Sequence, residues 1–488
     1  MSKIQAFVDV TKKVDLTNCS IQKSDAETRV HTVNLRFTYI ATVAGLLYVI
    51  ITGMMATFSA AATVDMQKPG SRFVHITEEE ISWIASLPLL TAASGNIVSG
   101  YASQKLGRKA VLMYFSALYL SSWLMIVYAS SIGWIYAGRI ICGFCSGMFN
   151  VAIPIYVAEI SVTEIRGFLS SGFQIAASGG MLLTMCLGAV LRWSWLAMTA
   201  AIITTCAACL MYFMPESPPW LIRHSKNTDA VKALEMLRGK DSDFMKEFRE
   251  ISDGQAKLST DSIRLRDILD PALYKALGIA VTLMFFQMFC GMSVLIAYTV
   301  EIFQSSGNFV NASVGSIIFT AVHVLAAAVS STLMDRIGRK KLYITSGSCM
   351  ILALTVLGIY SLMSSDNKIN SSSFGWIPLT CFIFYMIAFA TGYGPIPYVM
   401  IPEIVPIHSR STVMAVACIF GALSGFLATK VFYAMKFTLG MYGVYWTYAL
   451  FCFLGCIFCY FCMPETKGKS INEINLSFAA SNRVALPK

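Results

Sequence analysis

Long stretches of apolar residues recur along the chain, and shorter polar stretches separate them. A helix needs roughly 20 predominantly apolar residues to cross a bilayer, and the apolar stretches reach that length. We expect membrane-spanning helices at 37–60, 81–101, 110–130, 133–157, 168–190, 193–213, 273–303, 311–334, 341–363, 375–400, 411–436 and 442–463. The pattern therefore predicts an all-α membrane protein with twelve transmembrane helices, six on each side of a polar break.

The polar stretches divide the chain into five parts. The central one begins with Pro215-Glu216-Ser217, which is typical of a helix start. Apolar residues then recur at helical spacing at Val231, Leu234 and Leu237, so this part is expected to form amphipathic helices beside the bundle. The expected parts are an N-terminal tail at 1–36, a six-helix bundle at 37–213, a helical linker at 214–272, a second six-helix bundle at 273–463 and a C-terminal tail at 464–488.

Short motifs in the first half return in the second half, in the same order. Leu106-Gly107-Arg108-Lys109 returns as Ile337-Gly338-Arg339-Lys340, and Met214-Pro215-Glu216 returns as Met463-Pro464-Glu465. An acid also precedes an arginine by seven residues in both halves, as Glu159 with Arg166 and Glu403 with Arg410. A chain made of two copies of one membrane bundle can rock its halves about a site that lies between them.

Composition and charge support a membrane protein and exclude other classes. Of the 488 residues, 56% are hydrophobic and only 13% are charged, which is too few for a soluble protein of this size. The net charge is +10, and most Lys and Arg fall in the tails, the linker and alternate loops. Because basic residues favour the cytoplasmic side, both termini and the linker are expected there. The excess charge is thus a topology signal, and no nucleic-acid partner is expected.

The repeated motifs, taken together, resemble the sugar porter family of the major facilitator superfamily. The run Tyr298-Thr299-Val300-Glu301-Ile302-Phe303 further resembles insect facilitated trehalose transporters. The resemblance implies the major facilitator fold, transport by alternating access, and no enzymatic activity. The motifs are Gly107-Arg108-Lys109, Pro154-x-Tyr156-x-x-Glu159, Arg166-Gly167, Pro215-Glu216-Ser217-Pro218, Gln287-x-x-x-Gly291, Asp335-Arg336-x-Gly338-Arg339-Lys340, Gly394-Pro395-Ile396-Pro397 and Pro464-Glu465-Thr466.

The resemblance also implies a set of ion pairs at the cytoplasmic ends of the spans. In the first half, Arg108 and Arg166 would engage Glu159 or Glu216. In the second half, arginines would engage Glu403 or Glu465. Pairs that form and part with the conformation could act as gate elements, and the alternative is that these charges only set topology. The residues of the second-half set are Asp335, Arg336, Arg339, Glu403, Arg410 and Glu465.

Polar residues inside the apolar spans are candidates for binding a substrate. Gln174 and Gln287 stand where the family places sugar-binding glutamines, and the alternative for each is a helix–helix hydrogen bond. Other expected pocket residues depart from the family pattern towards a less polar site that suits a disaccharide or glycoside. Gly394, Pro395 and Pro397 predict a hinge, because proline interrupts the helix ladder. The remaining pocket candidates are Ser293, Tyr298, His323 and Tyr398.

The energy source is expected to be the sugar gradient itself. Residues 37–62 contain no Asp or Glu, whereas proton-coupled sugar porters carry an acid in the first span. We therefore expect facilitated uniport of a hexose or a trehalose-like disaccharide. The alternatives are a proton-coupled carrier, a carrier of another small organic solute, or a sugar sensor that does not transport.

Several further expectations complete the sequence prediction. We expect a monomer in the plasma membrane that holds no metal and no cofactor. The 14 cysteines mostly fall within spans, where they are expected to serve packing. Asn311 and Asn370 begin glycosylation sequons that would face outward.

Overall fold

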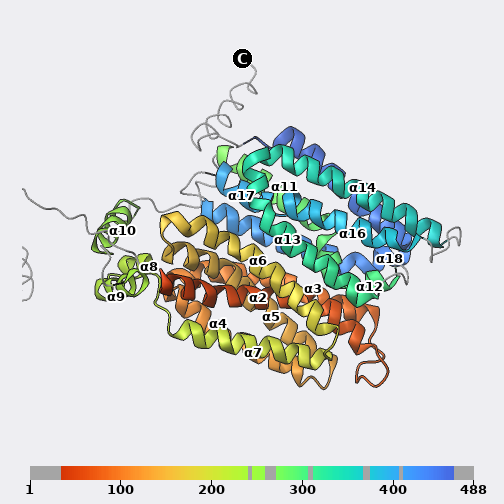
Figure 1. The fold of residues 1–488 in the computed structure, drawn as a ribbon, viewed down its shortest axis with the longest axis horizontal. Helices are drawn as coiled ribbons and strands as arrows, with labels where there is room; N and C mark the ends of the chain where they lie inside the picture. Colours follow the sequence, from red (N-terminus) through yellow and green to blue (C-terminus); the bar gives the residue numbers. More distant parts are fainter. Residues whose placement is uncertain are drawn as a thin grey trace, which may run out of the picture.

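The computed structural model describes residues 35–239, 244–258, 271–305, 311–365, 374–405 and 410–465, and these residues contain no strand. Figure 1 shows two slabs of helices that lie along one long axis. Asn370 and the two tails, 1–34 and 466–488, lie outside the described residues.

Six long helices form the first half. The glycines of this half allow the backbones to approach closely, since a Cβ on Gly53 of α2 would lie 2.1 Å from the Ala177 carbonyl oxygen of α6. A Cβ on Gly95 of α3 would likewise lie 2.1 Å from the Phe144 carbonyl oxygen of α5. Small residues at such crossings are typical of membrane helix packing. The helices are α2 (Arg36–Met66), α3 (Glu78–Leu106), α4 (Arg108–Val127), α5 (Ile132–Ile160), α6 (Thr163–Gly188) and α7 (Trp193–Tyr212).

Three short helices follow α7 and lie at one end of the bundle, which we call the linker end (Figure 1). They are α8 (Pro218–Arg223), α9 (Asn227–Arg238) and α10 (Phe244–Leu258). Buried Arg238 fastens them to the bundle, because its guanidinium donates to both carboxylate oxygens of Glu247, at 2.8 and 2.7 Å, and to the Ile160 carbonyl at 2.8 Å. It also donates to Thr38 Oγ1, at 3.2 Å. One arginine thus joins α9, α10 and the ends of α5 and α2.

The second half repeats the six-span plan with more interruptions. Span seven breaks at Gly291, whose φ is +99°, and span ten contains a π-helix. The 53-residue helix α18 is broken at Gly440, where φ is +68°, so it makes two spans. The elements are α11 (Pro271–Phe289), α12 (Met292–Ser305), α13 (Ala312–Ile337), α14 (Arg339–Ser365), α16 (Trp376–Ala388), η2 (Phe389–Tyr393), α17 (Ile396–Ile404) and α18 (Arg410–Cys462).

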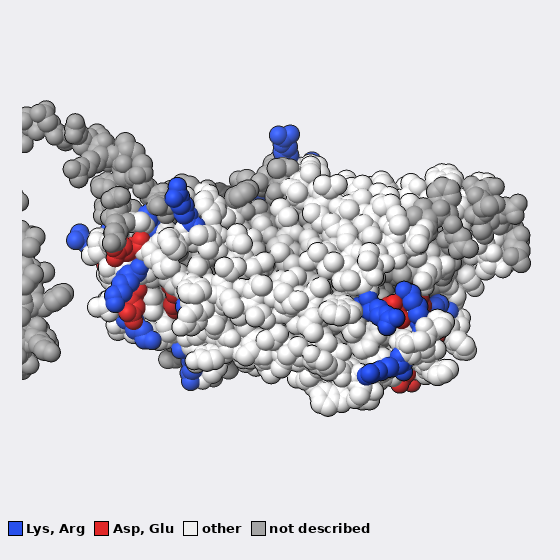
Figure 2. All heavy atoms as spheres, turned by 60° about the horizontal axis from the view of Figure 1, so that its bottom comes forward, with Lys and Arg blue, Asp and Glu red and all other residues white. Residues whose placement is uncertain are grey.

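The expected twelve-span, all-α fold is confirmed. Ten helical stretches are long and apolar enough to cross a membrane, one of them is the double-length α18, and Gly172–Gly188 of α6 is a shorter apolar helix. Most charged side chains on the face shown in Figure 2 lie near the two ends of the long axis. The band between them carries few charged side chains, as a bilayer requires.

Among the described residues, the main contacts between the two halves are α3 with α18, α2 with α12, and α6 with α13. At the end opposite the linker, which we call the distal end, Ser82 Oγ of α3 donates to the Lys430 carbonyl of α18 at 3.2 Å. The Lys430 ammonium lies 3.9 Å from the ring centroid of Trp83. The halves are therefore in contact at the distal end in this conformation.

Candidate functional site

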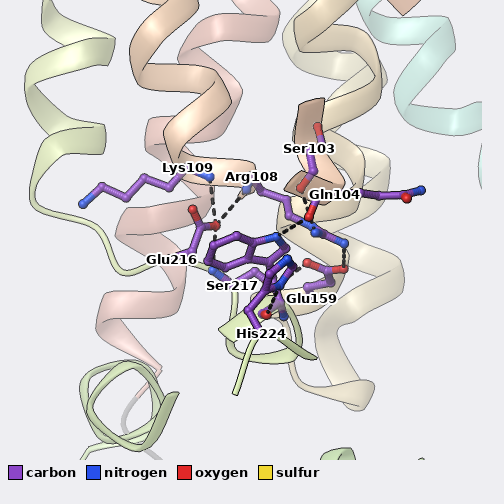
Figure 3. A network of polar contacts seen from close by, with 9 residues as sticks. Ser103, Gln104, Arg108, Lys109, Glu159, Glu216, Ser217 and His224 are labelled. Carbon is purple, nitrogen blue, oxygen red and sulfur yellow. Dashed lines mark hydrogen bonds and ion pairs between the residues drawn. The ribbon is translucent and has the colours of Figure 1, made fainter. Parts of the chain in front are cut away.

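The turn between α3 and α4 is held by the carboxylate of Glu216 (Figure 3). Gly107 turns the chain with a φ of +105°. Glu216 then accepts backbone N–H groups of Arg108 and Lys109, both at 2.9 Å, and of Ala110 at 3.3 Å. The first N–H groups of a helix lack partners within it and carry partial positive charge. A carboxylate is the group that best satisfies them.

Arg108 joins this turn to the end of α5. Its guanidinium donates to Glu159 Oε1 at 2.9 Å and to the Ser103 carbonyl at 3.0 Å. The hydroxyl of Ser217 donates to the other oxygen of Glu159. The side chains of Arg108 and Glu159 are 11% and 20% exposed, so the pair is partly shielded from water. We call the set Arg108, Glu159, Glu216 and Ser217 the first brace.

The second half builds the same arrangement from its own copies. Arg339 donates to Glu403 Oε1 at 3.0 Å and to the Met334 carbonyl, again five residues back, at 3.4 Å. Glu465 accepts the N–H groups of Arg339 at 3.1 Å and of Lys340 at 3.2 Å. Gly338 supplies the turn with a φ of +96°. We call Arg339, Glu403 and Glu465 the second brace.

Each brace lies wholly within its own half. The sequence predicts Arg108 with Glu159 or Glu216, and the structure brings all three together. It also joins Arg339 to Glu403 and Glu465. Arg336 is exposed, at the end of α13. The side chains of Arg166, Asp335 and Arg410 lie outside the described residues. The described pairs therefore stiffen the linker end of each half, and none of them crosses between the halves.

A π-helix directly precedes the predicted hinge residues Gly394, Pro395 and Pro397. Residues Phe389–Tyr393 form η2, and the Gly394 N–H donates to the Phe389 carbonyl, five residues back, at 2.8 Å. Ser346 of α14 serves both sides of this turn, because its hydroxyl donates to the Ala388 carbonyl at 2.6 Å and accepts the Tyr393 N–H at 2.8 Å. Such wide turns free backbone groups for other partners and are frequent at functional sites.

Gln287 lies against this hinge. It is 4% exposed on α11, and its side-chain N–H₂ donates to the carbonyl of Gly394. Its Oε1 is buried and has no hydrogen-bond partner among the described residues. A buried acceptor without a donor costs roughly 1–3 kcal/mol. Gln287 therefore presents an unused acceptor beside the break in span ten.

The other pocket candidates occupy different surroundings. Ser293 donates to the Met288 sulfur at 3.4 Å, and both lie near Gly425 of α18. Tyr298 is 1% exposed, donates to the Thr429 carbonyl at 3.3 Å and stacks on Phe432 at 4.7 Å.

The remaining candidates differ in their exposure. His323 is 3% exposed, and its Nδ1 has no hydrogen-bond partner among the described residues. Gln174 is exposed on α6, and Tyr398 is 46% exposed on α17. Asn311, a predicted glycosylation site, caps α13 by accepting the Ser313 N–H at 3.0 Å.

Arg139 is buried inside the first half and has backbone partners. Its guanidinium donates to the carbonyls of Met55 on α2 and Ile84 on α3, both at 2.9 Å, and lies 5.6 Å from the ring centroid of Phe58. The residue four positions after Ile84 is Pro88, which has no N–H to donate. The proline thus leaves free the carbonyl that the arginine uses.

Sequence analysis missed a polar cluster at the distal end. Glu301 of α12 binds Lys436 at 2.8 Å and accepts the Tyr433 hydroxyl at 2.5 Å. The available signal was an acid near the end of an apolar span, which is costly unless it is paired. It also missed Trp220, whose indole donates to the Gln104 carbonyl at 2.8 Å.

Comparisons with known proteins agree with this architecture. The family model for sugar (and other) transporters matches residues 37–478. A facilitated trehalose transporter of Bombyx mori is 35% identical over 409 residues, which cover 84% of this chain and 81% of that protein. One from Apis mellifera ligustica is 32% identical over 437 residues, 88% and 86% of the two chains. The counterpart from Drosophila mojavensis is longer, and the match spans 49% of it.

Solved structures share the fold at low sequence identity. The E. coli xylose transporter XylE, in a partially occluded inward open conformation, matches with a TM-score of 0.73 and 22% identity, over 89% of this chain and 99% of that one. Its inward open form matches with the same TM-score. The structural likeness shows a shared fold, and the family match together with the similarity to the Bombyx mori protein shows that the chain belongs to the sugar (and other) transporter family and is a membrane transporter, not an enzyme.

Proposed function

We propose that the chain carries a sugar across the plasma membrane by facilitated uniport, and that the sugar is a trehalose-like disaccharide or a hexose. The linker end is cytoplasmic in this proposal, which places both tails inside the cell. The protein acts as a monomer whose halves expose a central site alternately to either side. The three relatives above are named as facilitated trehalose transporters, which favours the disaccharide.

The observation that carries this proposal is the unused acceptor of Gln287. A sugar hydroxyl can donate to the buried Oε1 while the amide N–H₂ keeps its bond to the Gly394 carbonyl. Substrate would then connect directly to the hinge of span ten. A ligand shifts a conformational equilibrium only through contacts that differ between the states, and a contact beside the hinge meets this condition.

Two features support transport without proton coupling. The α2 helix has no acid between Arg36 and Asp65. The buried charge of Arg139 is compensated by two carbonyl dipoles, from Met55 and Ile84, and by the face of Phe58. No carboxylate has to lose a proton for this arginine to be stable where it lies.

The braces have a supporting role in this proposal. Arg108 with Glu159, and Arg339 with Glu403, keep the linker end of each half rigid. Rigid halves convert a small change at the hinge into opening at one end, because packed bundles move as units.

The test is uptake of labelled trehalose and glucose by proteoliposomes that contain the purified chain. We expect saturable uptake that ends when the sugar concentrations on the two sides are equal. An imposed pH gradient should not change this end point. Accumulation that a protonophore abolishes would instead show a proton-coupled carrier, and absence of saturable flux with any sugar would contradict the proposal.

Gln287 is tested in the same assay. Gln287→Ala is expected to raise KM for the sugar by up to about tenfold, the worth of one net hydrogen bond. Gln104→Ala is the matched control, because only the backbone carbonyl of Gln104 makes a described contact. An unchanged KM in Gln287→Ala would remove Gln287 from the sugar site.

A further inference from the structure

The outer part of span seven is a separate segment that side-chain contacts hold in place. Tyr298 has non-helical angles, φ −128° and ψ 21°, so α12 is interrupted there. The helix is kinked at this point, so the residues beyond it run in a different direction from those before it. We call residues 299–305 the distal segment, and its position depends on what its side chains bind.

One side of the distal segment faces the first half. Val300 is buried in a small apolar cluster with Ala60 of α2 and Met185 of α6. This cluster lies at the distal end, where Ser82 and Trp83 also contact Lys430. The segment therefore forms part of the closed contact between the halves.

The next residue binds in the opposite direction, to its own half. Glu301 Oε1 binds the ammonium of Lys436 at 2.8 Å, and Oε2 accepts the hydroxyl of Tyr433 at 2.5 Å. Both partners belong to α18, and the Lys436 ammonium also lies 5.4 Å from the Tyr433 ring centroid. Glu301 and Lys436 are 27% and 28% exposed, so the cluster is partly shielded and can still be reached by water when it opens.

The same stretch of α18 holds the first half as well. Lys430 contacts α3, whereas Phe432, Tyr433 and Lys436 contact α12. Tyr298 stacks on Phe432 at 4.7 Å and meets Tyr433 edge-on at 5.3 Å. Residues 430–436 thus connect the distal segment to the contact between the halves.

We propose that Glu301, with Tyr433 and Lys436, is a latch that holds the distal segment in the position that closes the distal end. The role of the latch in transport rests on the proposed function, in which a closed distal end blocks entry of sugar from outside. Opening of that end requires Val300 to leave α2 and α6, and the latch determines how firmly the segment keeps its closed position.

The latch is tested by hydrogen–deuterium exchange of the full chain in lipid nanodiscs. Glu301→Gln keeps the shape of the side chain and removes its negative charge. Lys436→Met removes the ammonium that pairs with Glu301. Each is expected to speed amide exchange in 299–305 by about three- to tenfold, as befits a partly shielded, charge-assisted contact. The charge-reversed pair, Glu301→Lys with Lys436→Glu, is expected to restore slow exchange.

Lys68→Met is the matched control, because it breaks the exposed Lys68–Asp65 ion pair within one helix end. It should leave exchange in 299–305 unchanged. Unchanged exchange in both Glu301→Gln and Lys436→Met would overturn the latch, as would equal acceleration in Lys68→Met. If one variant does not purify as a single species, Tyr433→Phe gives the same test.

The failure of this inference is distinct from failure of the proposed function. Exchange is measured without sugar, so it reports on the latch alone. In flux assays, Glu301→Gln is expected to lower the apparent KM for external sugar, because the distal end opens more readily. Normal sugar flux with unchanged exchange would remove the latch and leave the carrier in place.

Discussion

Arg139 and Pro88 are predicted to depend on each other. Arg139→Met removes the guanidinium from the core of the first half and leaves the Ile84 carbonyl without a donor, because Pro88 cannot supply one. The Met55 carbonyl keeps its helical N–H partner in the same variant. Pro88→Ala places an N–H four residues after Ile84, where it can complete the α-helical ladder. Arg139→Met should therefore lower the free energy of unfolding by less in the Pro88→Ala variant than in the original chain.

The magnitude follows from one orphaned carbonyl. A buried acceptor that loses its only donor costs about 1–3 kcal/mol. The single change Arg139→Met should carry this cost, and the double variant should not. A double-mutant cycle is therefore expected to give a coupling free energy of about 1–3 kcal/mol between positions 88 and 139.

The assay is reversible unfolding of the four purified proteins in detergent, followed by tryptophan fluorescence. Pro154→Ala serves as the control, because it removes a proline from α5 that has no described contact with Arg139. Its effect should add to that of Arg139→Met. If Arg139→Met lowered stability equally in the original chain and in the Pro88→Ala variant, the idea that the proline provides the carbonyl for the arginine would be refuted.

Three other predictions concern the linker end. Glu216→Ala removes the acceptor of three N–H groups at the start of α4, and should lower the free energy of unfolding by about 1–2 kcal/mol, measured in the same assay. Gly107→Ala should be more harmful than Gly338→Ala, because a Cβ would lie 2.3 Å from the Glu216 carboxylate in the first and 3.1 Å from that of Glu465 in the second; equal melting temperatures would contradict this. Arg238→Met should release α9 and α10 and speed tryptic cleavage there, since it leaves Glu247 unpaired at a cost of about 1.5–3 kcal/mol; an unchanged digestion pattern would show that other contacts dock these helices.

The spans and the braces were predictable because each has a strong local signal. The twelve spans can be recognised from the length and composition of the apolar stretches alone. The Gly-Arg-Lys motif and the acid that follows it occur in both halves, and this repetition indicated which charges pair. The sequence did not indicate that Glu216 and Glu465 accept backbone N–H groups at the starts of α4 and α14. The motif identifies the acid, whereas its partner depends on the residue at which the neighbouring helix begins.

Other contacts were beyond sequence reasoning for a different reason. The partner of Gln287 is the backbone carbonyl of Gly394 beside the π-helix. Every residue has a backbone carbonyl, so the sequence does not show which one is available. Arg139 was predictable as a buried charge without an acid, and Pro88 was visible in span two, but their meeting depends on how α3 and α5 cross. Glu301 was visible too, yet its partners lie more than 130 residues away.

The π-helix in span ten has a consequence for how such carriers diverge. One helical residue occupies about 100° of rotation, so the additional residue in a wide turn reorients every side chain that follows it. Tyr398 and Met400 sit just beyond it, the first 46% exposed and the second fully buried. Winding the same residues as an ordinary α-helix would turn α17 by up to about 100° relative to α16, and would change which of its side chains meet its neighbours without altering the chemistry of any residue.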